Sequence, residues 1–252
     1  MSQALIEAQG LAMRYPTGRL ALQNASLAVS GGELAVILGA NGSGKSTMLR
    51  IIAGMARPTE GHVRVEGKDI TTLSGRRLGE ARMALGMVFQ HANLVKRRSV
   101  LANVVCGTLG RHHNIATAFG MLPSAELPFG MRCLEQVGLA RFAHQRASTL
   151  SGGQAQRAAI ARALAQRPRA LLADEPVASL DPEASEEVMR LLRRLAKDEG
   201  MAILCVLHQP DLARRYADRV LGLRKGVIAF ADAPQNISDS EVDSLYEGFH
   251  PA

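Results

Sequence analysis

A phosphate-binding loop is the feature that most restricts the fold of this chain. Residues 39–46 read Gly-Ala-Asn-Gly-Ser-Gly-Lys-Ser, a complete G-x-x-x-x-G-K-[ST] pattern between the apolar run Leu34–Leu38 and the helix-like segment Thr47–Ala53. Glycines let backbone N–H groups turn inward around an anion, and the following helix N-terminus adds partial positive charge. The predicted cradle consists of Gly39, Ala40, Asn41, Gly42, Ser43, Gly44, Lys45, Ser46 and Thr47.

Two side chains of this loop have individual roles in such a cradle. Lys45 is expected to reach the β- and γ-phosphates of a nucleotide, and Ser46 is expected to bind Mg²⁺. A glycine-rich turn with an incidental lysine is the competing interpretation. The strand, motif and helix stand in the order that a phosphate cradle needs, which favours the cradle.

A pair of carboxylates follows a second apolar run. Arg169–Ala173 predicts a strand, and Asp174 and Glu175 come at its end. Asp174 fits the acid on the Mg²⁺ side of a P-loop enzyme, and Glu175 fits a general base that polarises the attacking water. Taken alone, two acids at a strand end are more often a solvated turn. The phosphate cradle on the same chain favours the catalytic interpretation.

Strand-like and helix-like segments alternate along the chain, which predicts an α/β fold with a mainly parallel sheet. The middle third, from about His91 to Arg167, contains only helix-like segments and is expected to be a helical insertion into that core. The expected strands are Ala4–Ala8, Ala25–Val29, Glu33–Leu38, His62–Glu66, Leu85–Phe89, Arg169–Ala173, Ala202–Leu207 and the hairpin Val220–Leu223 with Val227–Phe230. The expected helices include Val100–Leu109, Met131–Val137, Pro182–Glu199, Asp211–Ala217 and a last short helix capped by Ser238 and Glu241.

Composition excludes several classes of protein. The 30 basic and 23 acidic residues leave a net charge of +7, but no basic block is longer than Lys96-Arg97-Arg98, and there is no Trp. An aromatic and basic surface for nucleic acid is therefore not expected. Apolar runs reach about seven residues, as at Met201–Leu207, whereas a membrane-spanning helix needs roughly 20.

The N-terminus and the cysteines predict a soluble intracellular protein. The first ten residues, MSQALIEAQG, lack a basic segment followed by an apolar run, so no secretory signal is expected. Cys106, Cys133 and Cys205 are odd in number and form no C-x-x-C pair, which favours free thiols over a disulfide or a metal site.

The pentapeptide Leu150-Ser151-Gly152-Gly153-Gln154 precedes a long helix-like segment that runs to about Arg167. In isolation Ser-Gly-Gly is only a flexible turn. On one chain with the phosphate cradle and the Asp174-Glu175 pair, it makes the sequence resemble the ATP-binding cassette proteins, whose signature is LSGGQ. The resemblance covers about residues 4 to 230, and we expect one cassette domain over 4–248 with a helical subdomain at about 91–167.

The resemblance implies further site residues. Tyr15 matches the aromatic that stacks on adenine, and Gln90 matches the glutamine that senses the γ-phosphate, binds the metal and touches the transport channel. Asp181 lies in the loop that crosses a dimer interface, and His208 matches the switch histidine. Taken singly, each of these residues would carry little weight. Their order and spacing carry the resemblance.

The resemblance also implies a fold and a mechanism. The fold is a P-loop NTPase with a RecA-like core, an N-terminal antiparallel β subdomain and an inserted helical signature subdomain. Two copies pack head to tail, and each ATP lies between Lys45 of one copy and Ser151 and Gly153 of the other, with Gly152 and Gln154 beside them. ATP and Mg²⁺ are the expected cofactors, and hydrolysis reopens the dimer.

A single cassette of this kind resembles the separate ATPase subunit of a bacterial importer. Its expected partners are a second copy, integral-membrane permease subunits and, indirectly, a periplasmic binding protein, at the cytoplasmic face of the inner membrane. A soluble cassette protein acting on nucleic acid or the ribosome is an alternative, but the chain has one cassette and no long helical arm. A P-loop kinase is disfavoured because it has no use for the signature.

Several stretches resemble the ATP-binding subunits of phosphonate importers in particular. They are Phe89–Val104, Phe142–Leu150, Ala173–Pro182, Leu207-His208-Gln209 and Arg214–Tyr216, together with the long segment Gly110–Pro128. The resemblance implies uptake of phosphonates. It leaves phosphite or another oxyanion open, because the solute never touches this subunit.

Overall fold

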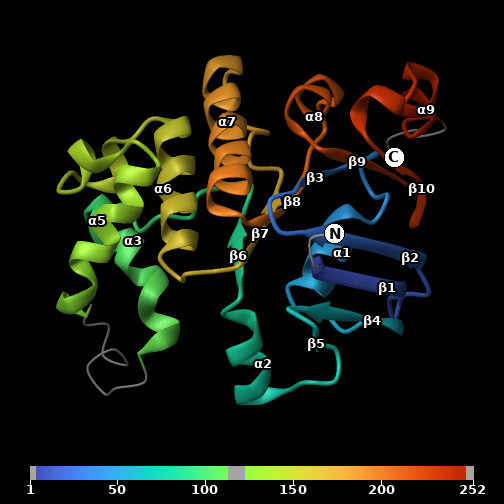
Figure 1. Ribbon diagram of the computed structural model, residues 1–252, viewed down its shortest axis with the longest axis horizontal. Coiled ribbons are helices and arrows are strands. Elements are labelled where there is room, and N and C mark those ends of the chain that lie inside the picture. The colour runs from blue at the N-terminus through green and yellow to red at the C-terminus, as the bar shows by residue number, and fades with distance from the viewer. Residues whose placement is uncertain (1–3, 113–122, 248–252) are drawn as a thin grey trace.

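The computed structural model describes residues 4–112 and 123–247, which form two β-sheets and the helices that cover them (Figure 1). The larger sheet has the strand order β10-β9-β3-β8-β7-β6. Its members are β3 (Leu34–Leu38), β6 (Leu85–Val88), β7 (Ala170–Asp174), β8 (Ala202–Val206), β9 (Arg219–Arg224) and β10 (Val227–Asp232). The neighbouring strands β9, β3, β8, β7 and β6 pair in parallel in that order. Strand β10 forms the predicted antiparallel hairpin with β9. The predicted α/β fold is confirmed.

Strand β3 lies inside this sheet and is buried on both faces. Leu34, Val36 and Leu38 pack into one core cluster, and Ala35 and Ile37 pack into another. The alternation follows from the two-residue period of a strand. Because parallel strands end at the same edge of a sheet, the segments after β3, β7 and β8 meet there, which places the phosphate loop beside the two carboxylates.

The smaller sheet is antiparallel, in the order β2-β1-β4-β5, and helix α1 (Lys45–Ile52) packs between it and the larger sheet. Its strands are β1 (Ala4–Arg14), β2 (Leu20–Ser30), β4 (Glu60–Val65) and β5 (Lys68–Asp69). The first two are longer than predicted. Register shifts along their pairing, such as the one between Ala8 and Leu11, interrupt the alternation from which a strand is recognised.

Helices α3 (Val100–Val105), α5 (Leu127–Gln136) and α6 (Gly152–Leu164) pack together at one end of the molecule (Figure 1). Helices α7 (Pro182–Glu199), α8 (Pro210–Tyr216) and α9 (Asp239–Ser244) contribute to the core cluster on the same face of the larger sheet. Short 3₁₀ segments lie at Cys106–Arg111, Ser124–Glu126, Ala140–Phe142, Ala147–Thr149 and Pro234–Asn236. The predicted helix Val100–Leu109 is thus an α-helix that continues as a 3₁₀ segment.

Two elements were not predicted, and one prediction falls largely outside the described residues. Helix α2 (Gly75–Arg82) contains two glycines and buries none of its residues, so it lacks an apolar stripe. Strand β5 has only two residues. Of the long segment predicted at Gly110–Pro128, residues 113–122 lie outside the described part of the chain.

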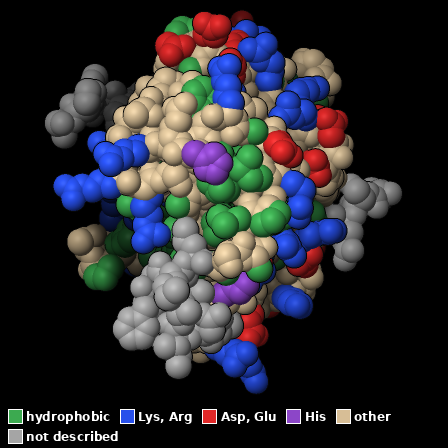
Figure 2. Space-filling model, turned by 90° about the vertical axis from the view of Figure 1, so that its left-hand side faces the viewer, with side chains coloured by type: hydrophobic (Ala, Val, Ile, Leu, Met, Phe, Trp, Pro, Cys, Tyr) green, Lys and Arg blue, Asp and Glu red, His purple; other side chains and the backbone are tan. Residues whose placement is uncertain are grey.

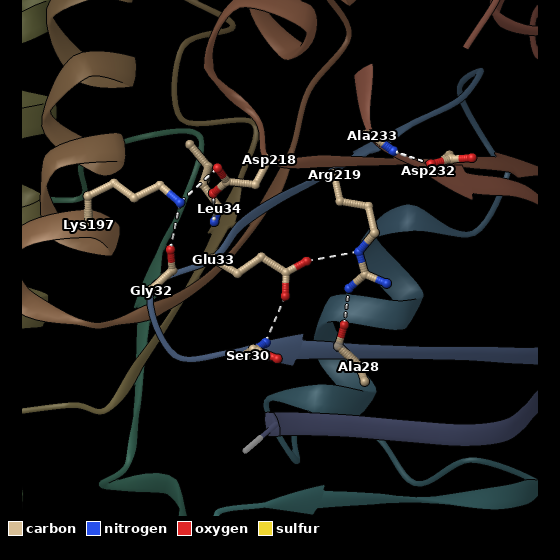
Figure 3. Close-up of polar contacts among 10 residues, drawn as sticks. All are labelled: Ala28, Ser30, Gly32, Glu33, Leu34, Lys197, Asp218, Arg219, Asp232 and Ala233. Carbon is tan, nitrogen blue, oxygen red and sulfur yellow. Dashed lines mark hydrogen bonds and ion pairs between the residues drawn. The ribbon is translucent and has the colours of Figure 1, made fainter. Parts of the chain in front are cut away.

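A polar network ties both sheets and α7 together (Figure 3). Glu33 forms an ion pair with Arg219 at 2.8 Å and accepts a hydrogen bond from the backbone N–H of Ser30. Asp218 pairs with Lys197 of α7 at 2.8 Å and accepts the N–H of Leu34. Both acids therefore stabilise the junction where β2 leads into β3.

Glu33→Ala is expected to lower the free energy of unfolding by about 2 kcal/mol, since it leaves a partly buried guanidinium and a backbone N–H without their acceptor. The matched control is Glu80→Ala, which removes an exposed pair with Arg76 and is expected to cost less than about 0.5 kcal/mol. Urea denaturation measures both variants. Equal losses would show that the network does not stabilise the junction.

Two further features concern helix length and the three cysteines. Among the described residues no helix is both long and apolar enough to cross a bilayer. Cys106, Cys133 and Cys205 are free thiols. Burial raises the pKa of Cys133 to about 11 and also raises the pKa of Cys205. These two buried thiols are therefore poor nucleophiles.

Candidate active site

The phosphate loop has a backbone that only glycine accommodates at its key positions. Gly39 and Gly44 have φ of +153° and +113°. A Cβ on Gly39 would lie 2.2 Å from the carbonyl oxygen of Leu223, and one on Gly44 would lie 2.4 Å from that of Ala21. The loop is thus pressed against β9 and β2, which holds its shape before any ligand binds.

Lys45 is buried at the first position of α1. Its Nζ donates to the carbonyl oxygens of Gly39 at 2.7 Å and Ala40 at 3.0 Å. Burial lowers the pKa of this ammonium group, while the charges of Glu175 and Asp174 act in the opposite direction. A cavity of about 190 Å³ adjoins it, lined also by Ser46, Thr47 and Glu175. A cation held this way can bind an anion in the cavity.

Ser46 and Asp174, both expected on the Mg²⁺ side of the site, lie in hydrogen-bond contact. The Ser46 hydroxyl donates to Oδ1 of Asp174 at 3.3 Å. Burial raises the pKa of Asp174, and the neighbouring Glu175 raises it further. A hydroxyl beside a carboxylate is an oxygen donor pair suited to Mg²⁺. No group of three or more His, Cys, Asp and Glu gathers as a metal site within residues 4–112 and 123–247.

Glu175 and His208 form the closest ionisable pair of the site. Strands β7 and β8 are neighbours, and Asp174 pairs with Val206, so the next residues of both strands project from one edge. Oε1 of Glu175 lies 2.5 Å from Nε2 of His208. Glu175 has φ +51°, an uncommon value for a residue with a side chain, and such backbone outliers gather at functional sites.

Tyr15 contacts Thr47, one of the residues that line the cavity beside Lys45. Its hydroxyl lies 3.2 Å from Oγ1 of Thr47. Its backbone N–H donates to the carbonyl oxygen of Arg19 at 2.9 Å, and this hydrogen bond closes the turn between β1 and β2. The phenol is half-buried. Gln90, in contrast, is exposed just after β6, and within the described part of the chain its side chain forms no hydrogen bond with Ser46 or Asp174.

The signature residues begin α6. The Ser151 hydroxyl accepts the N–H of Gln154 at 3.3 Å, and the Gln154 side chain accepts the N–H of Ser151 at 3.0 Å, so the two form a capping box. Gly152 is exposed beside Ser151. A Cβ on Gly153 would lie 2.8 Å from that of Ala184 in α7, a helix that Asp181 caps.

The sequence analysis did not single out three residues that hold this region together. Arg19 donates to the carbonyl of Gly42 at 3.3 Å and lines the phosphate cavity. In α6, Gln156 donates to the carbonyl of Phe89 at 2.9 Å, and Arg162 donates to those of Ala92 and Asn93. No sequence motif marks these roles, since the partners are backbone carbonyls far away in sequence.

A groove lies where α6 meets the larger sheet. Its volume is about 420 Å³, and its walls come from α6, β6, the end of α1 and the 3₁₀ segment Cys106–Arg111. Met55 and Phe89 are exposed at this groove, 52% and 37%, and Met83, Met87 and Cys106 line it with them. Flexible sulfur-containing side chains suit a surface that adapts to a partner.

Known proteins resemble this chain both in sequence and in fold. The sequence profile of the family described as "ABC transporter" matches residues 22–178. The chain is 42% identical to "Phosphonates import ATP-binding protein PhnC 2" of Halalkalibacterium halodurans, over 96% of this chain and 100% of that protein. It is 44% identical to the PhnC protein of Nitratidesulfovibrio vulgaris, over 94% of this chain and 90% of that protein.

The solved structures that align with this chain are also ATP-binding cassettes. The ADP conformation of MJ1267, described as an ATP-binding cassette of an ABC transporter, aligns with a TM-score of 0.86 at 26% identity, over 98% of this chain and 100% of that chain. A dimeric post-hydrolysis state of the cassette MJ0796, bound to ADP and Pi, aligns with a TM-score of 0.78 at 33% identity, over 91% and 98% of the chains. The sheets, the phosphate loop and the signature helix are therefore those of an established fold.

Proposed function

The chain belongs to the ABC transporter family, and on that premise we propose that it is the ATP-hydrolysing subunit of a bacterial phosphonate importer. The observation that carries the proposal is the 42% identity, over 96% of this chain and the whole of the relative, to a protein named as a phosphonate importer's ATP-binding subunit. Residues 4–248 act as one cassette domain, in which about 91–167 are the signature subdomain.

Binding of ATP uses the phosphate loop. Lys45 and the loop amides hold the β- and γ-phosphates, and Tyr15 stacks on the adenine. Thr47 lines the phosphate cavity with Lys45 and contacts the hydroxyl of Tyr15. Ser46 and Asp174, already in contact, would hold Mg²⁺ together with Gln90 once that residue moves inward. When bound, Mg²⁺ neutralises phosphate charge.

Hydrolysis needs a base and a residue that orients it. Glu175 accepts a proton from the attacking water, and His208, 2.5 Å away, keeps its carboxylate in place. The uncommon φ of Glu175 restricts the direction in which its side chain leaves the backbone. Gln90 reports to the permease whether the γ-phosphate is present.

Two copies enclose the nucleotide. Ser151 and the first amides of α6 form a second anion-binding helix N-terminus, with Gly152, Gly153 and Gln154 in its first turn. Each ATP is bound by Lys45 of one protomer and the signature of its partner, and Asp181 lies at the interface. Because the γ-phosphate makes contacts that exist only in the closed dimer, ATP binding drives closure and hydrolysis releases it.

The groove beside Gln90 is the docking site for the permease. It touches α6, whose Gln156 holds the backbone of Phe89 next to Gln90. A movement of the nucleotide site can therefore reach the groove through this helix. The protein is expected to lie at the cytoplasmic face of the inner membrane as a peripheral subunit, and the periplasmic binding protein acts on it through the permease.

The basic triplet Lys96, Arg97 and Arg98 is exposed near this surface, and the backbone carbonyl of Lys96 accepts the N–H of Ser148, just before the signature. Reversing all three charges to Glu is expected to reduce solute uptake at least about tenfold, because like charges at an interface cost several kcal/mol. ATPase activity of the purified subunit should stay within about twofold, since exposed charges away from the site contribute little. Unchanged uptake would contradict a contact with the permease or with lipid headgroups.

We assign a phosphonate as the transported solute because this chain is similar to the ATP-binding subunits of phosphonate importers. Phosphite or another oxyanion is the alternative solute for the same mechanism. The soluble-cassette alternative would place nucleic acid on the protein surface. Figure 2 shows Lys and Arg side chains spread around the face of the helical end rather than gathered in one block, which does not favour nucleic acid.

Affinity capture tests the class of partner. A tagged chain, isolated from detergent-solubilised cells of its native host, is expected to retain an integral-membrane permease. Reversal of charge at the basic triplet should lower that retention. Recovery of nucleic acid without a permease would contradict the importer and support the soluble cassette protein.

A further inference from the structure

A second cavity, of about 220 Å³, adjoins the phosphate loop. Asn41, Gly42 and Ser43 form one wall, Arg224 comes from the end of β9, and Lys225 comes from the turn between β9 and β10. Arg19 and Glu247 complete its charged lining. This cavity therefore lies among three cations and one carboxylate, and none of the roles above uses Arg224 or Lys225.

The cations of this cavity form no ion pairs with the carboxylates of the described residues. Within the described ranges, the side chains of Arg224 and Lys225 form no ion pair and no hydrogen bond, and Arg19 donates only to the carbonyl of Gly42. Arg224 is also half-buried, whereas unpaired arginines are usually exposed. Three cations against the single carboxylate of Glu247 leave the lining with a net positive charge, and a concave surface of net positive charge concentrates anions. The cavity is thus suited to an anion.

The size of the cavity and the type of its cations narrow the class of anion. Pockets for drug-sized ligands measure about 300–1,000 Å³, so 220 Å³ suits a smaller molecule. A guanidinium fork matches the paired oxygens of a phosphate or phosphonate group. We propose that Arg19, Arg224 and Lys225 bind a small dianion with a –PO₃ group, either inorganic phosphate or a phosphonate.

The cavity is connected to the nucleotide site. Arg19 lines both this cavity and the phosphate cavity beside Lys45. The N–H of Gly226, in the same turn as Lys225, donates to the carbonyl of Ser43 in the phosphate loop at 2.8 Å. An anion in the second cavity therefore competes with ATP for Arg19, and by thermodynamic reciprocity each ligand weakens the other.

The biological meaning rests on the proposed function. If the solute is a phosphonate, its accumulation inside the cell lowers ATP affinity and slows further import. If phosphate alone binds, the product of hydrolysis exerts the same feedback. Both sources share the chemistry of the site, and the test separates them.

The test is calorimetric titration of the purified full chain with methylphosphonate, 2-aminoethylphosphonate and inorganic phosphate. Arg224→Gln/Lys225→Gln is expected to weaken binding of the anion at least about tenfold, because each charge-assisted hydrogen bond contributes 1.5–3 kcal/mol. The matched control, Arg64→Gln/Lys68→Gln, removes two exposed charges on the smaller sheet and should leave binding unchanged. In ATPase assays the anion should raise the KM for MgATP in the unmodified chain and in the control, but not in Arg224→Gln/Lys225→Gln.

Two results would overturn the site. One is equal anion affinity in the unmodified chain and in Arg224→Gln/Lys225→Gln. The other is binding that Lys45→Met abolishes and Arg224→Gln/Lys225→Gln does not, which would place the anion in the nucleotide cradle. Binding of phosphonates supports feedback by the solute, and binding of phosphate alone supports feedback by the product. Uptake assays are independent of these titrations, so a failed importer hypothesis and a failed anion site give different results.

Discussion

Glu175→Gln is expected to reduce the kcat for ATP hydrolysis by about 10²–10⁴-fold, the contribution of a general base. The amide is nearly the same size and can still contact His208, whose Nε2 lies 2.5 Å from Oε1 of Glu175, so the site should keep its shape. The substitution removes the group that takes a proton from water. ATP binding should be retained, and the closed dimer should accumulate because hydrolysis, which reopens it, is blocked.

Light scattering with saturating MgATP measures this accumulation directly. The variant is expected to show the mass of two chains with MgATP and of one chain without nucleotide. Glu135→Gln, an exposed acid on α5, is the matched control and should turn over ATP at the normal rate. A Glu175→Gln variant that remains a monomer with MgATP would contradict the shared nucleotide site.

Lys45→Met is expected to weaken MgATP binding by about 10- to 100-fold, because hydrogen bonds to a charged group contribute 1.5–3 kcal/mol. Met fills much of the same volume but has no charge and no N–H donor. The free energy of unfolding should change by less than about 1 kcal/mol. The carbonyls of Gly39 and Ala40 lose a donor, but the cost of burying an ammonium group disappears as well.

Equilibrium binding of MgATP and urea denaturation of the same sample separate the two effects of Lys45→Met. Lys197→Met serves as a control for stability, since that lysine pairs with Asp218 far from the phosphate loop. The control should lose stability and keep its affinity for MgATP. Normal MgATP affinity in Lys45→Met would show that this lysine does not bind the phosphates.

The elements with local end signals were predicted best from sequence. Helix α7 begins and ends at Pro182 and Glu199 as predicted, because Asp181 caps its N-terminus and Gly200 takes the left-handed conformation after its C-terminus. The capping box of Ser238 and Glu241 is also present at α9. Bulged β1 and β2 were shortened in the prediction, and α2 was missed because it buries nothing.

The candidate site was predictable where one motif supplies both the residue and its position, as with Lys45 and Ser46. The contact of Glu175 with His208 depends on the pairing of β7 with β8, which no local pattern encodes. Arg19, Arg162 and Gln156 hold backbone carbonyls that are distant in sequence, so their roles became visible only in the folded chain. The sequence shows the type of each residue, but the tertiary contacts that give these residues their roles are seen only in the structure.

Uptake of labelled solute in the native host tests the central claim most directly. Methylphosphonate, 2-aminoethylphosphonate and phosphite would be offered to the intact strain, a deletion strain, and a deletion strain carrying Lys45→Ala. Both defective strains are expected to lose phosphonate uptake, and the unmodified gene is expected to restore it. Loss of phosphite uptake alone would keep the mechanism and change the solute. Normal uptake of all three solutes in the defective strains would contradict the assignment as a phosphonate importer.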